Sequence, residues 1–556
     1  MISLTRVPWR ASRKKSIGFA VTALLVVVDQ LAGVSTVEGQ SSTTANFSDP
    51  GPAVSQFVPN SAMPAQGFVQ APAATPAQPF VQAPMVDASA YQMVDPSYQA
   101  QPCNCPECQA AAAGTMMPAK PAAKKKGNPC ARSHKGVFYA NDFSYLDDPN
   151  YNGSCLGDAF KGIGPRGNID FGGQIRFRYN SESGLGQQAG ATRFQDTQND
   201  FLLARLRLYA DWQITDRVRL YTEGIYADVI AQNDEYIPRG PIDRNFGDFL
   251  NLFLDFKITD NSTVRVGRQE LLFGAQRLVS PLDWANTRRT FDGASLIQKW
   301  DDVKVNWFYV QAVPVLFNDF DESDSDQELF GFYSSFATLP NSTLDLYALG
   351  FNDSRGFATD AATVTFGSRI SGSKNDWHWD FEGGVQTGSF DTGGDIEAGF
   401  WTAGLGRSFN DLPWKPKVTF WYDFATGNRA DGDTQRFNDL FPLGHKYLGF
   451  IDAVTRSNIK APSIQLNLQP RDRLSLLIWY HNLNAAEEED IVASLGGTPA
   501  QSLLVEDFGN EIDFVANFKM TARTNLIAGY SHFFAGDKII DGEDADFFYL
   551  AWQTNF

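Results

Sequence analysis

The stretch IDFGGQIRFRY, residues 169–179, alternates between two kinds of side chain. The apolar side chains are Ile169, Phe171, Ile175, Phe177 and Tyr179. The polar side chains between them are Asp170, Gln174, Arg176 and Arg178. A period of two residues is typical of a β-strand that has one apolar and one polar face. The same alternation returns in residues 201–214, 248–258 and 376–388. It predicts an all-β fold built from antiparallel strands.

The connections between the predicted strands distinguish a membrane barrel from a soluble sandwich. About 18 strand candidates lie between residues 167 and 556, and short turns such as 301–302 alternate with long polar loops such as 314–327 and 426–458. Outer-membrane barrels have an even number of strands, short periplasmic turns and longer outer loops, with both termini in the periplasm. We therefore predict a transmembrane antiparallel β-barrel over residues 167–556 in the bacterial outer membrane, preceded by a disordered N-terminal segment.

Both ends of the sequence are consistent with this location. Basic residues up to Lys15 precede an apolar run that is too short to span a bilayer as a helix, which is typical of a secretory signal. Residues 1–40 are therefore predicted to be a signal peptide. The chain ends in FFYLAWQTNF, a period-2 strand that closes on Phe556. Such a strand resembles the signal that the barrel-assembly machinery reads, although by itself it could equally be an edge strand of a soluble sandwich.

The region before the predicted barrel divides into two parts. Residues 41–126 are rich in Pro, Ala, Gln and Ser, and this composition predicts a disordered periplasmic linker. Residues 127–166 form a pre-barrel segment. The cysteines are Cys103, Cys105, Cys108, Cys130 and Cys155. They lack the two separated ligand pairs of a zinc site, so disulfides or free thiols are favoured in an exported protein and no metal site is predicted.

The formal net charge is -18, yet residues 267–293, GRQELLFGAQRLVSPLDWANTRRTFDG, gather arginines among apolar residues. Rings of Arg are expected in anion pores, and the planar guanidinium suits carboxylates. An exposed loop this apolar would be a liability, so we expect residues 270–290 to fold against or into the barrel and narrow the pore. The predicted substrate-binding pore lining is Arg176, Arg178, Arg205, Arg207, Arg219, Arg265, Arg268, Arg277, Arg288, Arg289, His445 and Lys446.

Two other readings of these arginines remain open. They could bind lipid phosphates at the outer surface. Alternatively, they could only balance acids inside the barrel, for which Asp255, Asp283, Asp292 and Asp452 are available. The direction in which the loop 426–458, with His445 and Lys446, points does not follow from the sequence.

Three blocks of sequence resemble the alginate-export family of outer-membrane porins. They are residues 267–293, FPLGHKYLGFIDAV at 441–454, and NEIDFVANFKMTARTNLIAGYSHFFAGD at 510–537. The resemblance covers about 167–556 and implies an 18-stranded barrel whose electropositive lumen conducts an anionic polyuronate. Residues 136–148 and the linker do not match the family pattern.

Motifs of the common enzyme classes are absent. The sequence has no H-E-x-x-H, P-loop, dinucleotide fingerprint or G-x-S-x-G, and its five histidines are scattered. We predict no enzyme, no cofactor and no nucleic-acid partner. The leading hypothesis is a porin for anionic solutes, including an acidic polysaccharide such as a polyuronate, with an arginine-lined lumen. The alternatives are a general diffusion porin whose arginines are paired, and a membrane anchor whose N-terminal segment binds the envelope.

Overall fold

The computed structural model describes residues 129–185, 193–195, 197–234, 236, 240–355, 361–390, 394–429, 434–494 and 498–556. The predicted signal peptide, the whole predicted linker with Cys103, Cys105 and Cys108, and residues 127–128 lie outside the described residues. No helix among the described residues is long and apolar enough to cross a membrane.

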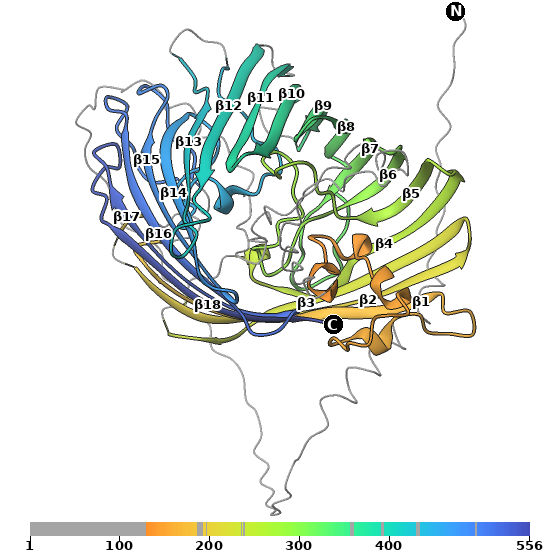
Figure 1. The fold of residues 1–556 in the computed structure, drawn as a ribbon. Helices are drawn as coiled ribbons and strands as arrows, with labels where there is room; N and C mark the ends of the chain where they lie inside the picture. Colours follow the sequence, from red (N-terminus) through yellow and green to blue (C-terminus); the bar gives the residue numbers. More distant parts are fainter. Residues whose placement is uncertain are drawn as a thin grey trace, which may run out of the picture. The chain divides into compact units, whose positions relative to one another are not determined.

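Antiparallel strands form one closed 18-stranded sheet (Figure 1), in which each strand pairs with the next and β18 pairs back with β1. The strands are β1 Ile169–Ser183, β2 Gln198–Thr215, β3 Val218–Gln232, β4 Asn245–Thr259, β5 Ser262–Gln269, β6 Thr290–Lys299, β7 Val303–Val313, β8 Gln327–Leu339, β9 Ser342–Asp353, β10 Ala361–Lys374, β11 Trp377–Phe390, β12 Asp395–Ser408, β13 Lys417–Ala425, β14 Ile459–Arg471, β15 Leu474–Asn484, β16 Asp507–Lys519, β17 Thr524–Ala535 and β18 Ala545–Asn555. The predicted barrel is confirmed.

One end of the barrel carries the short turns, such as 216–217, 260–261 and 472–473, together with the start of β1 and the end of β18. In outer-membrane barrels this is the periplasmic end. The alternation of loop lengths has one exception, because the connection 409–416 at this end is longer than the connection 391–394 at the other.

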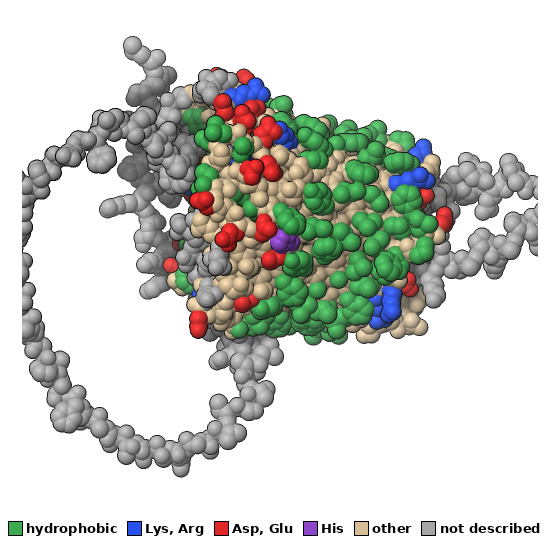
Figure 2. Space-filling view, turned by 90° about the vertical axis from the view of Figure 1, so that its left-hand side faces the viewer, with side chains coloured by type: hydrophobic (Ala, Val, Ile, Leu, Met, Phe, Trp, Pro, Cys, Tyr) green, Lys and Arg blue, Asp and Glu red, His purple; other side chains and the backbone are tan. Residues whose placement is uncertain are grey.

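The outer wall is apolar because alternate side chains of every strand face lipid. Phe177 is 41% exposed on the outside of β1, whereas its neighbours Arg176 and Arg178 are each 1% exposed. Figure 2 shows hydrophobic side chains over the middle of one side of the wall, with charged side chains towards its ends. This exposure pattern is the reverse of a soluble protein and agrees with a wall placed in a bilayer.

The lumen contains two inserted loops, which we call loop A (residues 270–289, between β5 and β6) and loop B (residues 426–458, between β13 and β14). They pair with one another: the backbone N–H of Phe441 donates to Leu278 O at 2.9 Å, and that of Leu443 to Gln276 O at 2.8 Å. Apolar side chains of both loops belong to one buried cluster with inward residues of the wall. Loop A therefore folds into the barrel as predicted, and loop B does the same, with a short turn of 3₁₀-helix at Gly444–Lys446.

The segment before β1 consists of short turns and one disulfide. It contains four 3₁₀ turns, Pro129–Arg132, Phe138–Ala140, Ser144–Asp147 and Asp158–Phe160, and a disulfide joins Cys130 to Cys155. A further 3₁₀ turn, Gly240–Ile242, lies between β3 and β4.

Candidate functional site

Three arginines from the first two strands bind the tip of loop A. Arg176 Nη1 donates to the carbonyl of Asp283 at 2.9 Å, and its Nη2 donates to those of Trp284 and Ala285, each at 3.2 Å. Arg178 Nη1 donates to Trp284 O at 2.9 Å, and its guanidinium stacks 3.7 Å from the Trp284 ring. These side chains meet because positions two apart on β1 share the inward face.

Arg205 completes this contact from β2. It donates to the carbonyls of Asp283 and Ala285 at 3.1 Å, and its Nη2 lies 2.8 Å from Asp283 Oδ1. The loop tip thus presents carbonyl oxygens, and one carboxylate, to three guanidinium groups. We call this contact between Arg176, Arg178, Arg205 and residues 283–286 the arginine latch.

A second cluster is a buried network of alternating charges. Arg207 Nε donates to Glu223 Oε1 at 2.7 Å, and its Nη2 lies 3.6 Å from Glu270 Oε2. Arg288 is ion-paired with both Glu270 and Asp283. Among these side chains only Asp283 has more than about one per cent of its surface exposed. Acids and arginines therefore balance one another here, as one of the alternatives for the arginines predicted.

Most of the remaining predicted residues are also engaged inside the lumen. Arg277 of loop A donates to Glu382 Oε2 at 2.6 Å. Arg289 donates to the carbonyls of Ser280 and Pro442, each at 3.4 Å, and so joins loop A to loop B. Arg265 forms a bidentate pair with Asp255, at 2.7 and 2.9 Å.

Three further predicted residues have these surroundings. Arg219 binds Asp211, with Nη2 2.6 Å from Oδ2. His445 of loop B is buried, lies 2.9 Å from Asp452 Oδ2 through Nδ1, and stacks 4.0 Å from the ring of Trp284. Lys446 is half-buried, with Nζ 5.1 Å from the centre of the Tyr447 ring.

The prediction for Arg268 is wrong. It shares the outward face of β5 with Val266, which is 48% exposed, and it binds Asp292 through two hydrogen bonds of 2.9 Å. Its Nη2 also donates to the carbonyl of Asp321 in the loop after β7. Arg265 and Arg268 are three positions apart, and such residues of a straight strand point to opposite faces. Arg265 and Arg268 therefore cannot both line the lumen.

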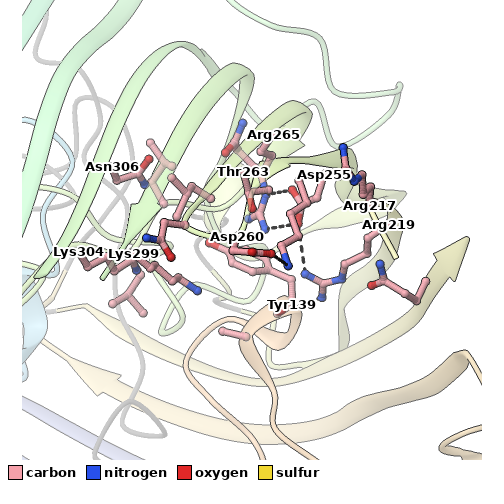
Figure 3. A pocket seen from close by; sticks show the side chains of 18 of the residues that line it. Tyr139, Arg217, Arg219, Asp255, Asp260, Thr263, Arg265, Lys299, Lys304 and Asn306 are labelled. Carbon is pink, nitrogen blue, oxygen red and sulfur yellow. Dashed lines mark hydrogen bonds and ion pairs between the residues drawn. The ribbon is translucent and has the colours of Figure 1, made fainter. Parts of the chain in front are cut away.

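A cavity of about 350 Å³ lies inside the barrel at the end with the short turns (Figure 3). Tyr139 of the pre-barrel segment forms one wall. The basic residues that line it are Arg217, Arg219, Lys257, Arg265, Lys299 and Lys304. The acidic residues that line it are Asp216, Asp255 and Asp260. We call this cavity the basic pocket.

The charges in the basic pocket are unequal. Arg219, Arg265 and Lys257 are paired with acids. Arg217, Lys299 and Lys304 form no ion pair with any residue that the structure describes. Sequence reasoning missed the two lysines, although strand alternation offered a signal: Lys299 has the same parity as Ser295 on β6, and Lys304 the same as Asn306 on β7, and both of those residues are buried.

The comparison with protein families decides the membership of the chain. The profile described as alginate export matches residues 168–551, from the start of β1 almost to the end of β18. The chain belongs to the alginate export family. It is therefore a channel protein of the bacterial outer membrane and not an enzyme. A search of curated proteins found no match.

Solved outer-membrane channels share the fold at low sequence identity. Acinetobacter baumannii OccAB1 matches with a TM-score of 0.50 and 12% identity, over 70% of this chain and 96% of that one. Pseudomonas aeruginosa OccK8 (OprE) matches with 0.50 and 10%, over 70% and 98%. A. baumannii OccAB3 matches with 0.50 and 11%, over 70% and 99%. At such identity the likeness concerns the barrel fold alone.

Proposed function

We propose that this member of the alginate export family passes anionic solutes, including an acidic polysaccharide such as a polyuronate, and that the basic pocket attracts them at the periplasmic mouth. The observation that supports the proposal is the excess of basic over acidic side chains in the pocket, with Arg217, Lys299 and Lys304 free of ion pairs among the described residues. A lumen lined by one sign of charge concentrates ions of the opposite sign.

Contacts between the cations of the basic pocket and the carboxylates of a solute are weak enough to let the solute pass through without being held. A water-exposed pair of a cation and a carboxylate contributes about 0–1 kcal/mol. Several such contacts in series allow a charged chain to move on, whereas one strong site would hold it. The arginines of the latch, on β1 and β2, are buried against the tip of loop A, and we infer that they meet solute only when the loop tip has moved.

The test is single-channel recording of the purified protein in planar bilayers. In the double variant Lys299→Gln with Lys304→Gln we expect the preference for anions over cations to fall, and block by polyuronate added at the short-turn end to weaken. Lys415→Gln is the matched control, because it removes a lysine in the turn 409–416 at the same end, outside the pocket. An unselective wild-type channel, or one that responds equally to both changes, would contradict the proposal.

A general diffusion porin is the second candidate. It is favoured by the ion pairs of Arg207, Arg219, Arg265, Arg277 and Arg288, which cancel much of the positive charge in the lumen. This candidate predicts conductance without anion preference and indifference to the two lysines.

A further inference from the structure

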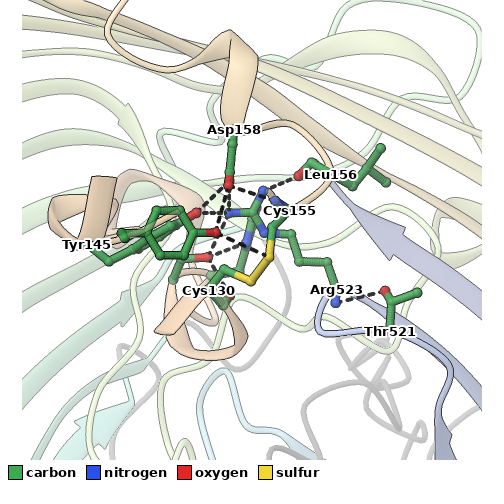
Figure 4. The surroundings of a disulfide bond; sticks show 10 residues. Cys130, Tyr145, Cys155, Leu156, Asp158, Thr521 and Arg523 are labelled. Atoms are coloured by element: carbon green, nitrogen blue, oxygen red, sulfur yellow. Dashed lines mark hydrogen bonds and ion pairs between the residues drawn. A yellow bond between two sulfur atoms is a disulfide. The ribbon is translucent and has the colours of Figure 1, made fainter. Parts of the chain in front are cut away.

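The pre-barrel segment, residues 129–166, crosses part of the periplasmic mouth, and we call it the mouth segment. At one side it is held by Arg523, in the turn between β16 and β17, which pairs with Asp158 at 2.8 Å and donates to Ser133 Oγ at 3.3 Å. Arg523 also donates to Tyr145 Oη and to the carbonyl of Leu156. These contacts are drawn in Figure 4 around the disulfide.

At its other side the mouth segment enters the lumen. Phe138 is buried in a cluster with Tyr209, Tyr221 and Phe253, which are inward residues of β2, β3 and β4. The guanidinium of Arg207 stacks on Phe138 at 3.9 Å. The segment therefore spans from the β16–β17 turn to β4, across the place where β18 meets β1.

The mouth segment is also fastened to loop A. Tyr139 Oη donates to the carbonyl of Glu270 at 2.8 Å, and Arg288 Nη2 donates to the carbonyl of Gly136 at 2.9 Å. A Cβ atom at Gly136 would lie only 2.9 Å from Leu272 Cδ1, so the backbone of Gly136 packs directly against the side chain of Leu272 in loop A. Because Tyr139 is also a wall of the basic pocket, solute that uses the pocket must pass beside this segment.

The disulfide encloses most of these contacts. Ser133, Gly136, Phe138, Tyr139 and Tyr145 all lie between Cys130 and Cys155. Between the two cysteines the chain forms only short 3₁₀ turns, so little local structure holds it in shape. A cross-link of this kind stabilises mainly by restricting the freed chain. Cys130 is buried, whereas Cys155 is half-buried and is the more exposed cysteine of the two.

We propose that the mouth segment is a gate held shut by the Cys130–Cys155 disulfide and opened by a dithiol reductant. One thiolate of the reductant attacks Cys155 Sγ and the Cys130 sulfur leaves as a thiolate. The second thiolate of the reductant then attacks the reductant's own sulfur in the mixed disulfide, and Cys155 leaves as a thiolate; both cysteine thiolates take up the protons that the reductant has released. The chain ends with two thiols and the reductant with one disulfide. The freed segment withdraws Phe138 and Tyr139 from the lumen and loses its hold on loop A.

The experiment compares the conductance of the full-length protein in planar bilayers before and after dithiothreitol, with thiol titration of the same sample. We expect reduction to raise conductance by about twofold or more, as when a segment leaves one side of a pore mouth. The double variant Cys130→Ser with Cys155→Ser should start at the higher conductance and not respond. The triple variant Cys103→Ser, Cys105→Ser, Cys108→Ser is the matched control and should respond like the wild type.

Two further measurements keep the outcome decisive. Arg523→Gln removes the other anchor without changing a thiol, and it should raise conductance in the absence of reductant. If the disulfide resists dithiothreitol, the conductance of the cysteine double variant tests the gate. If that variant does not fold, the test is the conductance of wild-type protein reduced under stronger conditions and that of Arg523→Gln. Equal conductance in the oxidised, reduced and variant proteins would overturn the gate. Since conductance is measured apart from ion preference, this result is independent of whether the channel selects anions.

Discussion

The arginine latch makes the position of loop A depend on single side chains. In Arg176→Gln the guanidinium that donates to the carbonyls of Asp283, Trp284 and Ala285 is lost. Hydrogen bonds from a charged donor contribute about 1.5–3 kcal/mol each. The three share two nitrogen atoms, so we count them as two and expect the closed position of the loop tip to lose roughly 3 kcal/mol. That corresponds to about a hundredfold change in the closed-to-open ratio.

The assay is the rate at which a thiol reagent reacts with Ala285→Cys. Ala285 is only 2% exposed, so labelling reports opening of the loop tip. The background carries Ser at positions 103, 105 and 108 and keeps the Cys130–Cys155 disulfide. We expect Arg176→Gln to increase the labelling rate by up to about two orders of magnitude.

Arg268→Gln is the matched control for this assay. It removes the same charge from the outward face of β5, away from the latch, and it should leave the labelling rate unchanged. Equal labelling in all three proteins would refute the reasoning, because the latch would then contribute nothing to the position of the loop. Equal acceleration in both variants would show that net charge, rather than the hydrogen bonds of Arg176, controls the opening.

Three other predictions concern buried charge. Arg277→Met should lower the free energy of unfolding by about 3–5 kcal/mol, because the Glu382 carboxylate then lies buried without this arginine. Adding Glu382→Gln should recover part of the loss, measured by thermal unfolding. No recovery would contradict the pairing. Burial lowers the pKa of His134 from 6.5 to about 3, with Arg523 and Lys161 adding to the effect, so the stability that this neutral histidine contributes is complete above pH 6.5 and falls as the pH drops towards 3. At pH 5 the loss should be roughly 2 kcal/mol, seen as lower hydrogen-exchange protection factors in residues 129–166, and His134→Leu should abolish that dependence. Burial raises the pKa of Asp321 to about 6, so its contribution is complete below pH 3.8 and is lost as the pH rises through 6. The hydrogen-exchange protection factors of residues 314–326 should therefore be lower at pH 8 than at pH 5, and the opposite order would be evidence against this.

The barrel could be predicted from sequence because lipid imposes the same rule on every strand. Alternation in residues 169–179 places Arg176 and Arg178 inside without any knowledge of their neighbours. The partners of these arginines could not be predicted in the same way, since loop A lies more than a hundred positions along the chain, and only the folded lumen brings Trp284 to Arg178. All four acids offered as partners, Asp255, Asp283, Asp292 and Asp452, are in fact engaged.

The errors of the sequence analysis have a common cause. Arginines were grouped by their density in the sequence, which brought Arg268 in and left Lys299 and Lys304 out. Strand parity, applied residue by residue, would have excluded the first and found the other two. Loop B contains apolar residues such as Phe441, Leu443 and Phe450, all buried, and these give the same indication of insertion as the apolar residues of loop A.

The tip of loop A touches both strands at which the barrel closes on itself. Arg176 and Arg178 belong to β1, while the ring of Trp284 meets Tyr549 of β18 edge-on, with 4.9 Å between the ring centres. Loop A thus connects the first and last strands from inside the barrel. These contacts make the junction of β1 and β18 stiffer than the hydrogen bonds between the two strands alone would make it.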